Sequence, residues 1–155
     1  VAPGASAGKD GRMTSSNPST ATVRRVVEWP DTDASGHHHN SLIMRLFEDA
    51  ERALLDAAGL AGTYFPTAPR VRQEIDFTGK LYFRQPVTTT ITLERVGRTS
   101  LTWHFEVWGE AFGDVPRRRA ASGRVICAHV PAGTDRSAPW PDAVRAALTP
   151  REDAG

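Results

Sequence analysis

The chain has 155 residues, 19 basic and 18 acidic side chains for a net charge of +1, and one cysteine, Cys127. This length predicts one domain with its own hydrophobic core. The balanced charge gives no electrostatic basis for binding nucleic acid or an anionic membrane surface, and no run of 18 apolar residues predicts a membrane span. The lone cysteine excludes an internal disulfide and favours a reducing compartment, so we expect a cytoplasmic protein.

Residues 1–22 are rich in Gly, Ala, Ser, Thr and Pro and lack the apolar run of a signal peptide, so we expect a flexible tail. Met13 is a candidate natural start, with residues 1–12 as an upstream extension. The apolar, β-branched stretch from Val23 to Trp29 predicts a strand that ends at Pro30. We place one domain at residues 23–131 and a C-terminal extension at 132–155, with a short helix in PDAVRAAL.

A polar stretch, DTDASGHHHN, precedes a predicted helix over residues 41–58. Asp31 is expected to be structural and to bond amides of this stretch. Asn40 or Ser41 is a candidate N-cap, and Gly59 is a candidate residue just past the helix end. The helix is predicted because its apolar residues recur at steps of one, three and four and form one stripe. These residues are Leu42, Ile43, Leu46, Phe47, Ala50, Ala53, Leu54 and Ala57.

After Pro69 the pattern changes to alternation with period two, which is typical of strands with one buried face. The predicted strands are RVRQEIDF, VTTTITLERV, SLTWHFEVWGE and RAASGRVICAHV, with turns at Gly-Arg and Phe-Gly-Asp. We expect an antiparallel meander. One long helix with about five antiparallel strands predicts an α+β fold in which the helix stripe packs on one face of the sheet.

Two stretches, VEWPDTDASGHHHNSLIMRLFEDAERAL and RVRQEIDFTGKLYFRQPVTTTITLERVGRTSLTWHFEVW, resemble the hotdog-fold acyl-CoA thioesterases of the 4-hydroxybenzoyl-CoA thioesterase type. The first stretch is similar to the family's Asp-x-Asp-x-x-Gly turn, followed by Asn and an LxxFExA helix. The other stretch is similar to its strand, Pro, long strand, Gly-Arg-x-Ser, strand layout. The resemblance covers about residues 23–130. It implies a sheet wrapped around the long helix, and a homodimer or dimer of dimers with the active site between two subunits.

The resemblance places Asp33 at the family's catalytic aspartate, as general base or nucleophile, with the helix N-terminal amides as an oxyanion hole. It also brings Gly36, His37, His39 and Asn40 into the candidate catalytic loop. The alternative for Asp33 is an Asx-turn acid, and for Asn40 a helix cap. Relatives often have Gly-His-Val-Asn-Asn where this chain has Gly-His-His-His-Asn.

The three histidines leave other interpretations open. In an extended loop, His37 and His39 share a face and, with Asp33, form a candidate metal site. Three adjacent histidines are not a ligand spacing, so we expect no metal. For His38 we favour a partly exposed polar residue with no role. By resemblance, Arg84, Arg98 and Ser100 lie near the substrate-binding edge, with hairpin or strand-end roles as the alternative.

The sequence therefore predicts a thioester hydrolase that converts an acyl-CoA to free acid and CoA. No cofactor is expected, since coenzyme A is part of the substrate. Three alternatives remain: a thioesterase acting on an acyl carrier protein, a hotdog protein that binds acyl thioesters without turnover, and a metal-binding protein.

Overall fold

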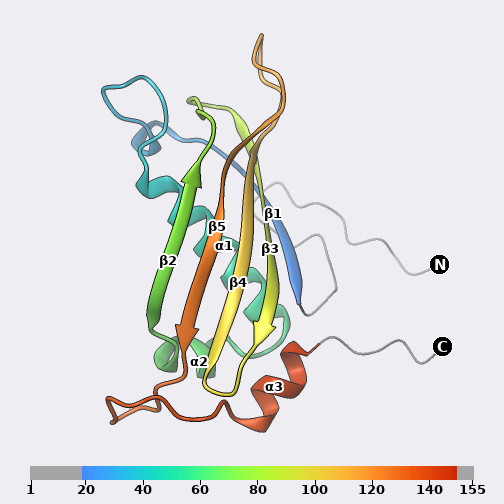
Figure 1. Ribbon diagram of the computed structural model, residues 1–155. Coiled ribbons are helices and arrows are strands. Elements are labelled where there is room, and N and C mark those ends of the chain that lie inside the picture. Colours follow the sequence, from blue (N-terminus) through green and yellow to red (C-terminus); the bar gives the residue numbers. More distant parts are fainter. Residues whose placement is uncertain (1–18, 150–155) are drawn as a thin grey trace, which may run out of the picture.

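The computed structural model describes residues 19–149. Most of the predicted N-terminal tail and the end of the predicted C-terminal extension lie outside this range. The strands are β1 (Thr20–Val26), β2 (Arg70–Phe77), β3 (Pro86–Val96), β4 (Ser100–Gly109) and β5 (Arg118–Ala128). The helices are α1 (Ser41–Ala57), α2 (Ala61–Tyr64) and α3 (Asp142–Leu148), with 3-10 turns η1 (Trp29–Asp31) and η2 (Phe65–Thr67). Figure 1 shows the arrangement.

The five strands form one antiparallel sheet in the order β1-β3-β4-β5-β2. Only β3, β4 and β5 follow one another as a meander. The prediction of a meander throughout was therefore wrong, because β2 pairs with β5 and leaves β1 and β2 at opposite edges. The chain must cross the end of the sheet between β2 and β3, and residues 78–85 make this crossing above the start of α1 (Figure 1).

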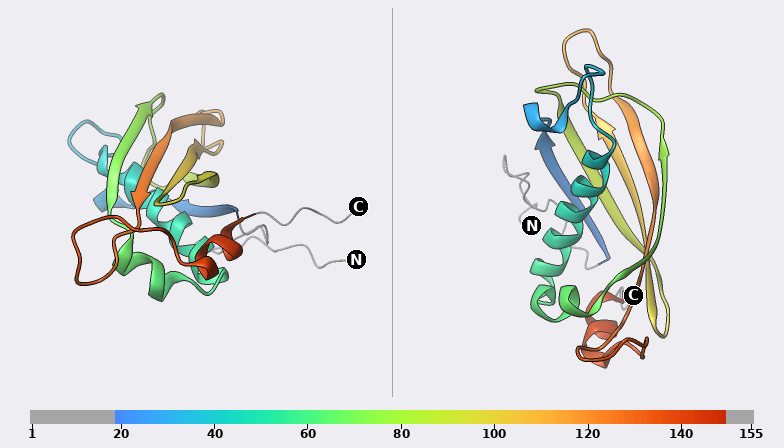
Figure 2. Two further views of the ribbon diagram at one scale, coloured as in Figure 1. Left: turned by 60° about the horizontal axis from the view of Figure 1, so that its bottom comes forward. Right: turned by 90° about the vertical axis from the view of Figure 1, so that its left-hand side faces the viewer.

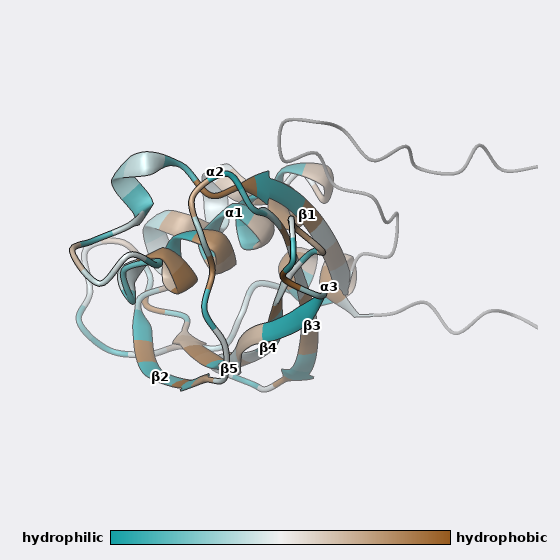
Figure 3. Cartoon of the chain, turned by 90° about the horizontal axis from the view of Figure 1, so that it is seen from above, coloured by the Kyte–Doolittle hydropathy of each residue, from teal (hydrophilic) through white to brown (hydrophobic). Residues whose placement is uncertain are grey.

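The sheet curves around α1, as the side view in Figure 2 and the view from above in Figure 3 show. Alternate side chains of β4 point at the helix and are buried, because successive residues of a strand face opposite sides of the sheet. The core joins the apolar stripe of α1 to this concave face. It includes Ile43, Phe47, Leu54, Ile91, Leu101, Trp103, Phe105 and Val125. The predicted α+β hotdog architecture is confirmed.

The element boundaries follow the sequence closely with three differences. Strand β1 begins at Thr20, three residues before the predicted start. It ends at Val26, three residues before the predicted end, and Trp29 lies in the 3-10 turn η1. The pair α2 and η2 was not predicted. Gly59 has φ +71°, which any side chain would strain, and it ends α1 as expected. The short helix expected in PDAVRAAL is α3. Within residues 19–149, no helix is long and apolar enough to cross a membrane.

A buried ion pair joins the middle of α1 to the first residue of β2. Both guanidinium Nη atoms of Arg70 bond the Glu51 carboxylate, at 2.6 and 2.7 Å, and Glu51 is fully buried. The Tyr64 hydroxyl donates to the same carboxylate at 3.3 Å. These contacts hold the start of β2 against the helix. The rest of β2 is an edge strand, with Val71 and Phe77 59% and 53% exposed.

Candidate active site

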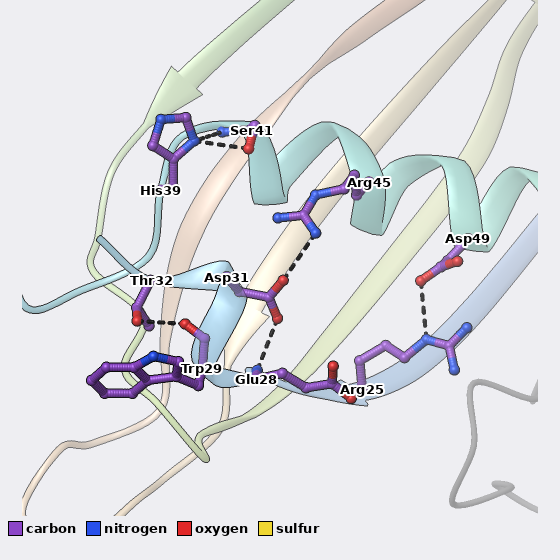
Figure 4. Close-up of polar contacts among 9 residues, drawn as sticks. All are labelled: Arg25, Glu28, Trp29, Asp31, Thr32, His39, Ser41, Arg45 and Asp49. Atoms are coloured by element: carbon purple, nitrogen blue, oxygen red, sulfur yellow. Dashed lines mark hydrogen bonds and ion pairs between the residues drawn. The ribbon is translucent and has the colours of Figure 1, made fainter. Parts of the chain in front are cut away.

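The polar stretch after β1 is anchored by Asp31, whose side chain is nearly buried. One carboxylate oxygen accepts the backbone N–H of Glu28 at 2.8 Å, and the other lies 3.0 Å from the Arg45 guanidinium on α1 (Figure 4). The N–H of His39 donates to the Asp31 carbonyl at 2.7 Å. The structural role predicted for Asp31 is confirmed, since it ties both ends of the loop to the helix.

Asp33 lies on the exposed part of this loop, in a turn that closes on Gly36. The Gly36 N–H donates to the Asp33 carbonyl at 3.0 Å, and Gly36 has φ +83°. Glycine suits this left-handed conformation because it has no Cβ. The Asp33 Oδ1 accepts the N–H of Ser35 at 2.8 Å and also its hydroxyl. The Asx-turn alternative therefore describes the geometry of Asp33 correctly.

These bonds leave one carboxylate oxygen of Asp33 free to react. Both go to Oδ1, and Oδ2 accepts no hydrogen bond from the part of the chain that the structure describes. The bonds from the Ser35 hydroxyl and N–H hold the pKa of the Asp33 carboxyl below its ordinary value of 3.8, and the neighbouring His39 and His37 act in the same direction. Asp33 is therefore ionised at neutral pH, with one oxygen open to solvent.

The start of α1 is less open than the sequence suggested. The N–H groups of Leu42 and Ile43 donate to the carbonyls of His39 and Asn40 at 3.0 and 3.3 Å. The N–H of Ser41 donates to His39 Nδ1 at 3.1 Å. The amides expected to form the oxyanion hole in the first helical turn are thus occupied, because the loop closes tightly onto the helix.

Two amides just before the helix remain free. Among the described residues, the N–H groups of His37 and Asn40 have no hydrogen-bond partner. Asn40 is the N-cap residue by position, but its side chain makes no capping bond. An unbonded N–H at the start of a helix, where the helix dipole is positive, favours a negative charge nearby.

The prediction that His38 is a partly exposed polar residue was wrong. It is only 7% exposed, and its ring and backbone both bond Leu81 in the crossing segment. Burial lowers the pKa of His38 below its ordinary 6.5, and the neighbouring His37 adds to this effect. Alternation in an extended loop turns His38 inward while its two neighbours turn outward. The three residues are identical, so the sequence does not indicate which histidine is buried. The position of His38 in the middle of the triplet determines its burial.

One open pocket of about 520 Å³ collects these groups. Asp33, Ser35, His37, His38 and Asn40 line one wall of it. The opposite wall consists of Phe77 at the end of β2 and residues 78–80 of the crossing segment. This second wall was not predicted from the sequence, because the pattern of β2 gives no indication of which residue lies opposite the Asp33 loop.

The other predicted site residues lie elsewhere in the single chain. His39 and Arg84 are not part of the pocket lining. The Arg84 guanidinium carbon lies 5.0 Å from the centre of the Phe83 ring. Arg98 and Ser100 lie in the β3–β4 hairpin beside α3. The 10 residues of β4 separate this hairpin from the Asp33 end of the sheet by about 30 Å.

The histidine triplet does not form a metal centre in this geometry. Across residues 19–149, no three His, Cys, Asp or Glu side chains are grouped closely enough to hold an ion. The His37 and His38 rings lie 5.8 Å apart, while His39 turns to Ser41.

A family model described as the thioesterase-like superfamily matches residues 27–148. The comparison with curated protein sequences gives no match. Among solved structures, a predicted thioesterase from Bacillus stearothermophilus is similar, with 27% identity and a TM-score of 0.71 over 83% of this chain and 93% of that one.

Two further structures show the same fold at lower identity. A 1,4-dihydroxy-2-naphthoyl-CoA thioesterase from Synechocystis is 17% identical, with a TM-score of 0.73 over 83% of this chain and 95% of that one. The dynemicin thioesterase is 20% identical, with a TM-score of 0.70 over 82% of this chain and 93% of that one.

Proposed function

The chain belongs to the thioesterase-like superfamily, which confirms the prediction of a thioester hydrolase, and on this basis we propose that its substrate is an acyl-CoA. The observation that carries the proposal is that Asp33, His37 and Asn40 line one pocket, and that the backbone N–H groups of His37 and Asn40 have no partner among the described residues. A carboxylate and two amide donors supply what hydrolysis of a thioester needs: activation of the attacking group and stabilisation of the oxyanion. The CoA thioester substrate in the name of the Synechocystis relative supports the choice of acyl-CoA.

In the proposed reaction, the thioester carbonyl oxygen accepts hydrogen bonds from the Asn40 and His37 amides. Asp33 either attacks the carbonyl carbon or takes a proton from the attacking water. When Asp33 attacks, loss of the CoA thiolate leaves an acyl-Asp33 anhydride, which water hydrolyses to the free acid and the Asp33 carboxylate. When Asp33 acts as the base, water adds to the carbonyl carbon, and collapse of the tetrahedral intermediate expels the CoA thiolate and gives the free acid.

Arg98 and Ser100 lie far from this pocket in the single chain, so a second copy of the chain must supply them. The edge strand β2 pairs with β5 on one side, and its apolar side chains Val71 and Phe77 are exposed. Antiparallel pairing of two β2 edges about a two-fold axis places the Arg70 end of one copy beside the Phe77 end of the other. Because the Arg70 end is also the Ser100 end, the partner's hairpin then lies at the same end of the joined sheet as Asp33.

We therefore propose a homodimer, or a dimer of such dimers, in which Arg98 and Ser100 from one copy face the CoA portion bound at Asp33 of the other. Arg84, beside the crossing segment, is proposed to meet the same portion of the substrate from the Asp33 side. The free, buried thiol of Cys127 is compatible with the reducing cytoplasm, which we propose as the location.

The function is tested with a panel of aliphatic and aromatic acyl-CoA esters, assayed by release of free thiol, beside the same acyl groups on a carrier protein. Turnover is expected for at least one acyl-CoA and is expected to persist after chelation with EDTA, since we propose no cofactor or metal. Hydrolysis of carrier-bound substrates alone would favour the carrier-protein alternative. Binding without thiol release would favour a non-catalytic protein.

A further inference from the structure

His38 makes a two-point contact between the catalytic loop and the segment that crosses from β2 to β3. Its backbone N–H donates to the Leu81 carbonyl at 2.8 Å, and its ring Nδ1 accepts the Leu81 N–H at 3.1 Å. The ring bond determines the tautomer. An Nδ1 that accepts a backbone N–H carries no proton, so the neutral ring has its proton on Nε2.

The segment that receives this contact is firmly held. Leu81 is fully buried in the core, and the buried Gln85 side chain bonds the Tyr82 N–H at 3.1 Å and the Glu110 carbonyl at 2.9 Å. Gly79 lies so close to the Arg119 carbonyl that a Cβ would be only 2.7 Å from it. The loop that carries Asp33 is exposed by comparison. His38 is therefore the point where an exposed polar loop is fixed to the sheet.

The two joined segments are also the two walls of the pocket. Residues 78–80 end immediately before Leu81, and Asp33, His37 and Asn40 flank His38 on the opposite wall. A loop displaced by about 1 Å can cost an enzyme about 10²-fold in rate, because the attacking group and the oxyanion donors must be aligned together. A contact that sets the separation of the two walls thus acts on the reaction without touching the substrate.

We propose that His38 is a positioning residue: as the neutral Nε2–H tautomer, it clamps the Asp33 loop to Leu81 and so holds the carboxylate and the His37 and Asn40 amides in register. This inference deepens the proposed function and rests on it. It also makes the clamp sensitive to acid. A proton on Nδ1 would turn the acceptor into a donor facing the Leu81 N–H, and the ring bond would break.

The surroundings of His38 determine when this happens. The titratable groups around it are Asp33, His37 and His39 on its own loop and Lys80 on the crossing segment. Burial and the like charges of His37 and His39 oppose protonation, whereas Asp33 favours it, and the net effect places the pKa below 6.5. Because His38 loses the ring bond when it is protonated, the clamp predicts an acid limb of kcat that depends on His38.

Two substitutions separate the clamp from other roles of the imidazole. In His38→Asn, the amide oxygen occupies the place of Nδ1 and still accepts the Leu81 N–H, but it does not titrate. In His38→Gln, the amide occupies the place of Nε2 and the acceptor at Nδ1 is lost. We expect His38→Asn to keep kcat within about threefold at neutral pH and to lose the acid limb, and His38→Gln to lose about 10²-fold in kcat.

A further measurement does not depend on activity. Hydrogen exchange of the Leu81 amide is expected to be slow in the wild type and in His38→Asn and fast in His38→Gln, at a pH where all three are folded. An active His38→Gln with an inactive His38→Asn would overturn the proposal in favour of donation from Nε2. An acid limb that persists in His38→Asn, or equal Leu81 exchange in all three proteins, would also overturn it. A wild type inactive on every thioester would instead refute the proposed function, while Leu81 exchange would still test the clamp.

Discussion

The ring Nδ1 of His39 accepts hydrogen bonds from both the backbone N–H and the hydroxyl of Ser41, at 3.1 and 2.8 Å, and thereby caps α1 (Figure 4). The capping side chain is thus one residue earlier than the position where Ser, Thr, Asp or Asn usually serves. Of the three consecutive histidines, His39 caps the helix, His38 bonds the crossing segment and His37 faces the pocket. Each has its own structural environment.

This cap predicts a difference in stability between two neighbours. His39→Ala should lower the free energy of unfolding by about 1 kcal/mol, since the first helical N–H loses its acceptor. Asn40→Ala serves as the matched control and should cost less, because the Asn40 side chain makes no capping bond. Urea unfolding followed by circular dichroism measures both, and an equal or larger loss in Asn40→Ala would contradict the assignment.

The burial of His38 predicts a dependence of stability on pH. A histidine whose pKa is lower in the folded state contributes stability that is complete above the unfolded pKa, about 6.5, and is lost as pH falls through the folded pKa. Between these two pKa values, His38 is protonated in the unfolded chain but not in the folded one, so a fall in pH favours unfolding. The wild type should therefore lose more stability than His38→Asn between about pH 7.5 and pH 5 in urea titrations. Parallel losses in the two proteins would show that His38 does not carry this effect.

The proposed dimer predicts that the two sheet edges respond differently to a charge. Val71→Lys, on the edge strand β2, should lower the apparent mass in solution from dimer to monomer and reduce acyl-CoA hydrolysis. Val26→Lys is the matched control on the opposite edge, since Val26 is 51% exposed and Val71 59% exposed. Light scattering after size-exclusion chromatography measures the mass. Dissociation by Val26→Lys but not by Val71→Lys would contradict pairing through β2.

Local patterns predicted the elements of this fold because each rule acts within a few residues. The period-two alternation in β3 and β4 and the apolar stripe of α1 each follow from one buried face, and all three elements lie where the patterns indicate. The strand order could not be predicted in this way. Pairing of β2 with β5 joins residues such as Arg70 and Cys127, which are 57 positions apart, and no alternation within either strand encodes that choice.

The same contrast holds at the candidate site. The turn at Asp33 and Gly36 was predictable because an acid followed three residues later by glycine suits a local hydrogen-bonded turn. The burial of His38 was not, because it depends on Leu81, 43 residues later in the chain. The proposed role of Arg98 and Ser100 was also not predictable from local patterns, since it depends on a second copy of the chain.

The Asp33 carboxylate is the group that we propose performs the attack or proton transfer in thioester hydrolysis. Asp33→Asn tests this role most directly, because the amide oxygen can still accept the Ser35 bonds and preserve the turn. Free thiol release from an acyl-CoA that the wild type hydrolyses is measured beside Asp135→Asn, an exposed aspartate in another loop. We expect kcat to fall about 10²–10⁴-fold in Asp33→Asn and to stay unchanged in the control, with both proteins folded. Near-complete activity in a folded Asp33→Asn protein would show that the Asp33 carboxylate has no such role.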